Sequence, residues 1–251
     1  MAERTAGVPS TRRPDYQSTP PVDRRPSGGI VVPLVSRFAG DRTRRVLSVV
    51  AAAALLVITL PLWVVIAIAI KLTSAGPIFY TQTRVGLDRR SRPPRPGTPE
   101  RSRDLGGRPF KILKFRTMRV DAEHGVGAVW AQPNDPRVTP IGRMLRDYRL
   151  DELPQLINVL RGDMNIVGPR PERPDIVSGL RDHIPHYLSR QRVLPGITGH
   201  AQVNLEYDSS VDDVRRKIEF DIEYVGQASV WQDIKIMLKT IPVVLFRRGS
   251  R

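Results

Sequence analysis

Two adjacent carboxylates, Asp151 and Glu152, lie near the start of the stretch RLDELPQLINVLRGDMNIVGPRPE, residues 149–172. A carboxylate repels its neighbour unless arginines or a divalent cation offset the charge. Mg²⁺ suits such a pair, because it uses one or two carboxylates and completes its coordination shell with phosphate oxygens and water. An ionised aspartate held in this way could attack a phosphorus atom and form an aspartyl phosphate. The pair is therefore a candidate site for phosphoryl transfer.

Arginines flank this pair in the sequence. Arg146 and Arg149 precede it, and Arg170 lies between two prolines that restrict its backbone. The N-terminus of a helix favours phosphate as much as carboxylate, because its free N–H groups point toward the ligand. A purely structural interpretation is also open, in which Asp151 is an N-cap and both carboxylates offset the helix dipole.

A short amphipathic helix is predicted directly after the pair. Its apolar residues recur at positions i, i+3, i+4 and i+7 and form one stripe: Leu153, Leu156, Ile157 and Leu160. Pro154 is tolerated because it falls in the first turn, and Gly162 is a natural stop. The helix would therefore hold the carboxylates at its N-terminal end.

The remaining pattern predicts an α+β fold, mostly helical around a short sheet. Apolar and basic residues alternate over residues 110–118, which is typical of a strand. Helical patterns dominate after Pro140, at residues 141–148, 153–162, 211–225 and 230–246. The last of these has a wide apolar face, and Lys235 and Lys239 can reach lipid headgroups, so we predict an amphipathic helix at the membrane interface.

The composition limits the possible partners. The 251 residues include 40 lysines and arginines against 25 aspartates and glutamates, a net charge of +15. Such a surplus attracts polyanions, which include nucleic acid, anionic lipids and phosphorylated substrates. The chain has no cysteine, which excludes disulfides, thiolate metal sites and cysteine nucleophiles.

Three regions are distinguished along the chain. Residues 1–40 are rich in proline and arginine and are expected to be a disordered basic tail. Residues 41–75 contain a long apolar run, and residues 76–251 form the predicted catalytic domain. Within that domain, an Arg- and Pro-rich insert at about residues 88–107 is expected to be a flexible loop.

The apolar run indicates insertion into a membrane. Arg45 and Lys71 are separated by 25 uncharged residues, more than the ~18 that mark a membrane segment. Both flanks are basic, so the positive-inside rule favours the cytoplasm for both. Pro61 removes one helical hydrogen bond and favours a kink. From these residues alone, two interpretations stay open: a tilted single span, and a helix broken at Pro61 that enters and leaves by the same face.

Three blocks of sequence together carry a family resemblance. They are KFRTM at residues 114–118, DPRVTPIGRMLRDYRLDELPQLINVLRGDMNIVGPRPE at residues 135–172, and PGITGHAQV at residues 195–203. In this order they resemble the bacterial sugar transferases, the monotopic phosphoglycosyl transferases. The resemblance covers about residues 42–249. In that family the membrane segment is a re-entrant helix broken at a Ser-Pro pair, and this chain keeps the proline, Pro61, without the serine.

The resemblance implies a Mg²⁺-dependent enzyme at the cytoplasmic face of the inner membrane. Such an enzyme transfers a phosphosugar from a UDP-sugar to a polyprenyl phosphate and releases UMP, which initiates the assembly of exopolysaccharides or other glycoconjugates. Asp151 matches the nucleophile of the family, and Glu152 matches its metal-associated partner. Arg146 and Arg170 match positions that bind phosphate or nucleotide. The implied partners are the two substrates and membrane lipid, without nucleic acid.

Lys114 and Arg116 lie in the first of these blocks and are further candidates for substrate binding.

A second hypothesis is a membrane-anchored basic protein without enzymatic activity, which binds nucleic acid or anionic lipid. A binding module of this kind gathers its arginines on one face, often with aromatic residues between them. Here many arginines fall in segments expected to be disordered, and aromatic residues make up only 6% of the chain. We therefore favour the enzyme.

Overall fold

The computed structural model describes most of the chain from residue 40 onward. The described residues are 40–88, 105–120, 122, 135–205 and 211–247. The predicted tail, but for its last residue, and most of the predicted Arg- and Pro-rich insert lie outside them, so these two predictions are not tested.

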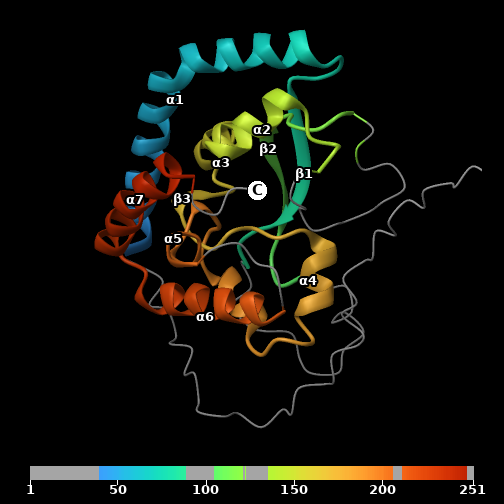
Figure 1. The fold of residues 1–251 in the computed structure, drawn as a ribbon. Coiled ribbons are helices and arrows are strands. Elements are labelled where there is room, and N and C mark those ends of the chain that lie inside the picture. Colours follow the sequence, from blue (N-terminus) through green and yellow to red (C-terminus); the bar gives the residue numbers. More distant parts are fainter. Residues whose placement is uncertain (1–39, 89–104, 121, 123–134, 206–210, 248–251) are drawn as a thin grey trace, which may run out of the picture.

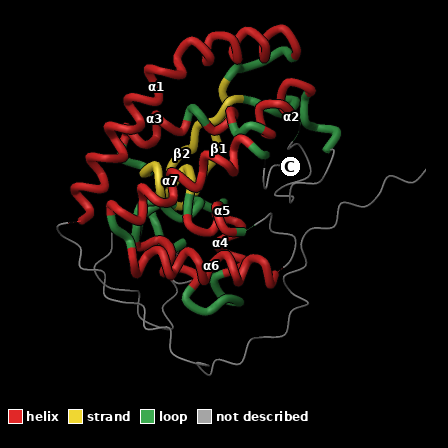
Figure 2. Tube along the Cα trace, turned by 60° about the vertical axis from the view of Figure 1, so that its left-hand side comes forward, coloured by secondary structure: helices red, strands yellow, loops and turns green. Residues whose placement is uncertain are grey.

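Helices surround two small β-sheets (Figures 1 and 2). Helix α1 (Gly40–Thr73) runs along one side of the domain and then over one end. Helix α7 (Val230–Leu245) lies beside the first part of α1, and α6 (Val211–Gln227) lies at the opposite end of the domain. This arrangement confirms the prediction of a mostly helical α+β chain with little sheet.

Each sheet has two strands. Strand β1 (Phe79–Val85) pairs antiparallel with β2 (Pro109–Phe115), and β3 (Asn165–Val167) pairs parallel with β4 (Gly196–Thr198). The strand predicted at residues 110–118 corresponds to β2. The other three strands were not predicted. Strand β3 is buried on both faces and has only three residues, so it shows no alternation of apolar and polar side chains.

The four predicted helices are present, and the described residues also form four shorter helices that were not predicted. Helix α2 (Pro140–Asp147) begins at Thr139, whose hydroxyl accepts a hydrogen bond from the Gly142 amide at 3.0 Å. Helix α3 (Gln155–Arg161) ends at Gly162, which has a φ of 90° as expected for a helix stop. The short elements are the 3₁₀ helices η3 (Leu150–Glu152) and η4 (Tyr187–Arg192), and the α-helices α4 (Pro174–Leu180) and α5 (His200–Asn204).

Helix α1 bends without being interrupted. The helix continues through Pro61 to Thr73, so a break at Pro61 is not confirmed. The helix instead curves, as is common where a proline removes one backbone hydrogen bond. The Thr59 hydroxyl donates to the Leu55 carbonyl at 2.7 Å, a contact that often accompanies bent helices. The Trp63 indole N–H in turn donates to the Thr59 hydroxyl at 3.2 Å.

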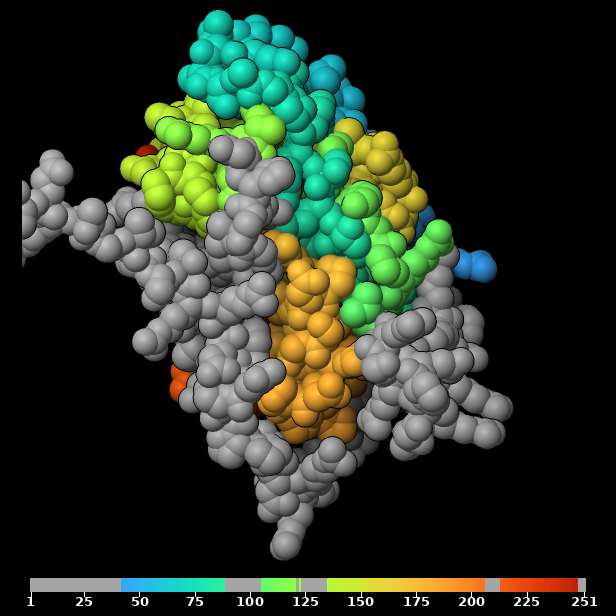
Figure 3. Space-filling model, turned by 90° about the vertical axis from the view of Figure 1, so that its right-hand side faces the viewer, coloured from blue at the N-terminus to red at the C-terminus, as the bar shows by residue number. Residues whose placement is uncertain are grey.

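One face of α1 packs against the domain over most of its length. Ala52 joins the core formed with α3, α6 and α7. In the second half, Trp63, Ile66 and Ile70 pack against Phe115 of β2 and Leu145 of α2. In Figure 3 this second half projects at the top of the molecule, above β1 and α2. Much of the remaining apolar surface of α1 is exposed.

By length and composition, α1 is the one helix in the described part of the chain that could cross a membrane. Its most apolar window has a mean hydropathy of 2.8, and only 17% of that window is buried in the domain. A core helix would be mostly buried, so this exposure indicates membrane association. Helix α7 also exposes apolar side chains: Trp231, Leu238, Ile241 and Leu245. Contact of α7 with lipid stays a prediction.

A buried ion pair fixes the start of α1. The Arg44 Nε donates to Asp233 Oδ2 at 2.9 Å, and both side chains are 3% exposed. The Tyr224 hydroxyl completes the cluster by donating to Asp233 Oδ1 at 2.6 Å. The next residue, Arg45, donates to the Met164 carbonyl at 2.6 Å. Arg44 and Arg45, which belong to the basic flank before the apolar run, are therefore bound within the domain.

We expect Arg44→Met and Asp233→Asn each to lower the free energy of unfolding by about 3–5 kcal/mol, because each leaves an uncompensated buried charge. Thermal or chemical unfolding in detergent micelles measures this loss. Arg42→Met is the matched control, since Arg42 is exposed two residues earlier, and its effect should stay within about 0.5 kcal/mol. If all three variants behaved alike, the pair would not be what holds α1 to the domain.

Candidate active site

The two carboxylates lie on the tight turn of η3, between α2 and α3. The Glu152 amide donates to the Arg149 carbonyl at 3.1 Å, which closes the turn. Arg149 has a φ of 55°, a left-handed conformation that is uncommon for a residue other than glycine. Asp151 and Glu152 are each only 6% exposed. Two charged groups are thus held together away from most of the solvent.

The interpretation of Asp151 as a helix N-cap is wrong. The residue before the first turn of α3 is Pro154, and no side chain caps that helix. The side chain of Asp151 instead contacts Lys114, whose Nζ lies 3.3 Å from Asp151 Oδ2. The left-handed turn at Arg149 separates α2 from η3, and the carboxylates of η3 face Lys114 of β2.

Lys114 and Arg170 balance the charge of the carboxylates. Lys114 Nζ also lies 3.0 Å from Glu152 Oε1, so one ammonium group bridges both acids. Arg170 Nη2 lies 2.6 Å from the same Glu152 oxygen. Burial alone would raise the pKa of Glu152, but Arg170 and Lys114 hold that pKa well below its ordinary value. Glu152 is therefore ionised at neutral pH.

The two carboxylates differ in how strongly they are held. Both oxygens of Glu152 contact Arg170, at 2.6 and 3.4 Å. Asp151 contacts Lys114 through Oδ2, and within the described residues its Oδ1 has no hydrogen-bond partner. Asp151 therefore keeps one oxygen available to a substrate, whereas Glu152 is anchored.

The other predicted binding residues lie on neighbouring elements. Arg146 Nε donates to the Thr117 hydroxyl at 2.9 Å. The Arg116 guanidinium donates to the backbone carbonyls of Ser74, at 2.7 Å, and Ala75, directly after α1. Neither arginine forms an ion pair with the two carboxylates. The structure thus brings Lys114 and Arg170 to the site, and substrate binding by Arg116 and Arg146 stays a prediction.

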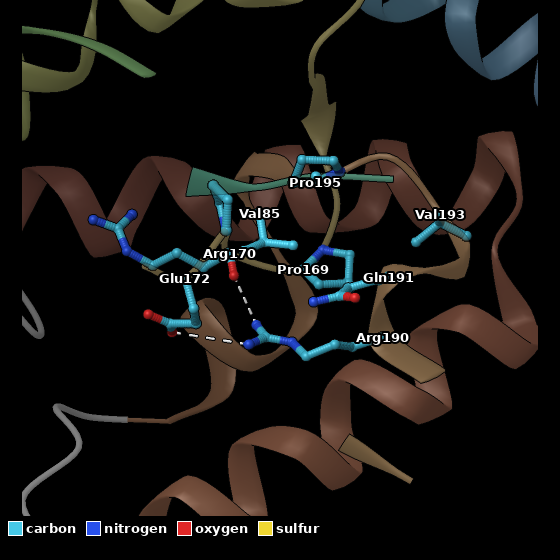
Figure 4. A pocket seen from close by; sticks show the side chains of 10 residues that line it. Val85, Pro169, Arg170, Glu172, Arg190, Gln191, Val193 and Pro195 are labelled. Carbon is cyan, nitrogen blue, oxygen red and sulfur yellow. Dashed lines mark hydrogen bonds and ion pairs between the residues drawn. The ribbon is translucent and has the colours of Figure 1, made fainter. Parts of the chain in front are cut away.

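A second cluster of charged side chains lies beside the backbone of Arg170 and is centred on Glu172 and Arg190. The carboxylate of Glu172 contacts Lys217 of α6 at 3.0 Å, Arg84 of β1 at 3.8 Å and Arg190 of η4 at 3.9 Å. Burial opposes the charge of Glu172, but Lys217, Arg190 and Arg84 lower its pKa to about 2. Figure 4 shows the side chain of Arg170 extending away from Arg190, while the Arg170 carbonyl faces it.

Arg190 is the centre of this cluster. It donates to the Arg170 carbonyl at 2.7 Å and pairs with Asp221 Oδ2 at 2.7 Å. Burial opposes the charge of Arg190, but Asp221 holds the pKa of the guanidinium above its ordinary value. Asp221 itself is only 1% exposed.

The sequence analysis did not predict the partners of Glu172, although Glu172 is the last residue of the stretch 149–172 that contains the two carboxylates. Arg84, Arg190 and Lys217 come from three elements far apart in the chain, and no local pattern links them. The one available signal was that Glu172 lies two residues after Arg170, an arginine between two prolines.

Comparisons with known proteins identify the family and several relatives. The model of the family described as "Bacterial sugar transferase" matches residues 39–247. A glucose-1-phosphate transferase of Caulobacter vibrioides, named for UDP-glucose and undecaprenyl phosphate, is 43% identical over 232 residues. That alignment covers 90% of this chain and 79% of the relative.

Two further relatives differ in length from the chain. An N-acetylgalactosaminephosphotransferase of Aeromonas hydrophila, named for UDP-N-acetylgalactosamine and undecaprenyl phosphate, is 40% identical, over 83% of this chain and 45% of the relative. The exopolysaccharide production protein ExoY of Rhizobium meliloti is 35% identical, over 85% of this chain and 90% of the relative. The chain therefore spans less than half of the Aeromonas relative and most of the other two.

Proposed function

Because the chain belongs to the bacterial sugar transferase family, we propose that it transfers a phosphosugar from a UDP-sugar to a polyprenyl phosphate and releases UMP. The observation that carries this proposal is the pair of Asp151, with an available oxygen, and Glu152, held in its charged form. The relatives named for UDP-glucose and UDP-N-acetylgalactosamine make these two nucleotide sugars the first to test.

The reaction divides into two displacements at one phosphorus atom. In the first, an oxygen of Asp151 forms a bond to the phosphorus that carries the sugar, and the bond from that phosphorus to the bridging oxygen breaks. UMP leaves with the electron pair. In the second, a phosphate oxygen of the polyprenyl phosphate attacks the same phosphorus, and the Asp151 carboxylate is released. The products are UMP and a polyprenyl-diphosphate-sugar.

The surrounding cations make the approach of a diphosphate feasible. Two carboxylates alone would repel it, whereas Lys114 and Arg170 lie within 3.3 Å and 2.6 Å of their oxygens and offset both charges. Lys114 bridges the two acids, so its positive charge lies next to Asp151 as well as next to Glu152. An uncharged aspartic acid would be a poor nucleophile.

The site also fits Mg²⁺, with substrate oxygens completing the coordination shell. Asp151 Oδ1 has no partner among the described residues, and the one contact of Glu152 Oε2 there is the 3.4 Å contact to Arg170. The described residues hold no group of three or more His, Asp or Glu that could bind a metal. Glu152 would therefore hold the ion together with substrate oxygens, as is usual for Mg²⁺. A bound Mg²⁺ would offset developing negative charge on the phosphates.

We expect Asp151→Asn to abolish UMP release while the protein stays folded, because an amide of similar size is not a nucleophile. UMP release is measured with purified protein, a panel of UDP-sugars and Mg²⁺, with and without polyprenyl phosphate. The wild type should also form a phosphosugar adduct that polyprenyl phosphate removes. Near-normal turnover by the Asn variant would refute the assignment of the nucleophile.

Glu152→Gln and removal of Mg²⁺ by a chelator should each lower the rate by orders of magnitude. A second measurement does not depend on activity: Mg²⁺ should raise the thermal midpoint of the wild type in the presence of UDP, and it should not do so for Glu152→Gln. Full activity in chelator would show that the metal assignment is wrong.

We also propose that α1 is re-entrant and that the domain faces the cytoplasm at the inner membrane. Arg44 binds the start of α1 to Asp233, and Arg116 binds the carbonyls directly after its end. A helix held at both ends by one folded domain has both ends on the same side of the bilayer, and the bend in Figure 1 is compatible with this path. UDP-sugars and Mg²⁺ are cytoplasmic, which supports the orientation.

Single cysteines at Ser10 and Ser178 test this topology, since the chain has no other cysteine and Ser178 is exposed. In intact cells, a membrane-impermeant maleimide should label neither Ser10→Cys nor Ser178→Cys, and permeabilised cells should label both. Labelling of Ser10→Cys alone in intact cells would show a true span.

Pro61→Ala should straighten α1 and lower activity, because it restores a helical hydrogen bond.

The hypothesis of a non-enzymatic basic protein finds no support. The relatives from Caulobacter vibrioides and Aeromonas hydrophila are both named as transferases. Arg44, Arg116 and Arg190 are moreover buried against partners in the domain, where they cannot form a face for nucleic acid or anionic lipid.

A further inference from the structure

We propose that Glu172 is a positioning residue, which holds Arg170 against Glu152 through the loop formed by residues 168–172. We call this segment the Arg170 loop. The inference rests on the proposed function, because it explains how the arginine of the active site is kept in place. Glu172 itself does not contact Asp151 or Glu152, so its role would be indirect.

Three consecutive carbonyls of the Arg170 loop are bound from outside it. The Arg170 carbonyl accepts from Arg190 at 2.7 Å, and the Pro171 carbonyl accepts from Arg84 at 3.2 Å. The Glu172 carbonyl accepts from the Val85 amide at 2.9 Å. The backbone of the loop is therefore attached to both β1 and η4.

The two arginines that bind these carbonyls depend on the Glu172 carboxylate. Arg84 and Arg190 lie 3.8 and 3.9 Å from its oxygens, and Lys217 lies 3.0 Å away. Three cations around one partly buried carboxylate would repel one another if that charge were removed. Arg190 would retain Asp221, but Arg84 and Lys217 would lose an ion-pair partner. Neutralising Glu172 should therefore loosen the contacts that hold the loop.

A loosened loop would displace Arg170 directly. Pro169 and Pro171 restrict the backbone on either side of Arg170, so a shift at Glu172 is poorly absorbed within the loop. The guanidinium of Arg170 contacts Glu152. Figure 4 shows that the Arg170 side chain extends away from Arg190. A displacement of about 1 Å in an active site can lower the rate about 100-fold.

The experiment compares four proteins: the wild type, Glu172→Gln, Arg170→Met and the double variant. We expect Glu172→Gln to lower kcat for UMP release by about 10- to 100-fold. In the Arg170→Met background the same change should have little further effect, because Glu172 acts through Arg170. A residue that only stabilises the fold would give effects that add.

The thermal midpoints of the same four proteins form a second cycle that does not depend on activity. Arg170→Met should lower the midpoint clearly in the wild type and only slightly in Glu172→Gln, where the contact of Arg170 with Glu152 is already loosened. Asp175→Asn is the matched control, because Asp175 lies three residues from Glu172 but its side chain is 69% exposed. It should leave both kcat and the midpoint unchanged.

If Glu172→Gln does not fold, Lys217→Met replaces it, since it removes only the shortest of the three contacts to Glu172. Additive effects in both cycles would overturn the positioning role, as would an unchanged kcat in Glu172→Gln. A wild type that releases no UMP from any UDP-sugar would instead overturn the proposed function, and the thermal cycle would still decide whether Glu172 holds Arg170.

Discussion

The site depends on holding two neighbouring carboxylates side by side while both are nearly buried. Their mutual repulsion and the loss of solvent each favour protonation, so the fold must supply positive charge at contact distance. It does so from two directions, with Lys114 from β2 and Arg170 from the loop after β3. Neither cation belongs to η3 itself. The tertiary structure, rather than the local sequence around Asp151, therefore determines the chemistry of the pair.

The requirement for distant cations explains the arrangement of the rest of the domain. Arg170 can face Glu152 only if its loop is fixed, and the groups that fix it come from β1, η4 and α6. Helix α6 in turn contributes Tyr224 to the cluster that attaches α1 through Arg44. Helix α6 thus takes part in both clusters, through Lys217 beside Glu172 and through Tyr224 beside Asp233.

Local patterns predicted the parts of the molecule that local physics determines. The apolar stripe before Gly162, the alternation in β2 and the long apolar run each arise from neighbouring residues, and all three are present. The dyad could be singled out because its two members are adjacent. The turn at Arg149 could not, because no glycine marked its left-handed backbone. The pairing of Asp221 with Arg190 could not be predicted either, because the two residues lie in different elements.

Lys114 of β2 and Arg116, directly after β2, connect the active site to the end of α1. Lys114 bridges the catalytic acids, and Arg116, two residues later, grips the carbonyls at the end of α1. Because only one residue separates Lys114 from Arg116, a displacement of the end of α1 relative to the domain should also displace the ammonium group that faces the acids. We therefore expect the lipid around α1 to influence the geometry of the active site.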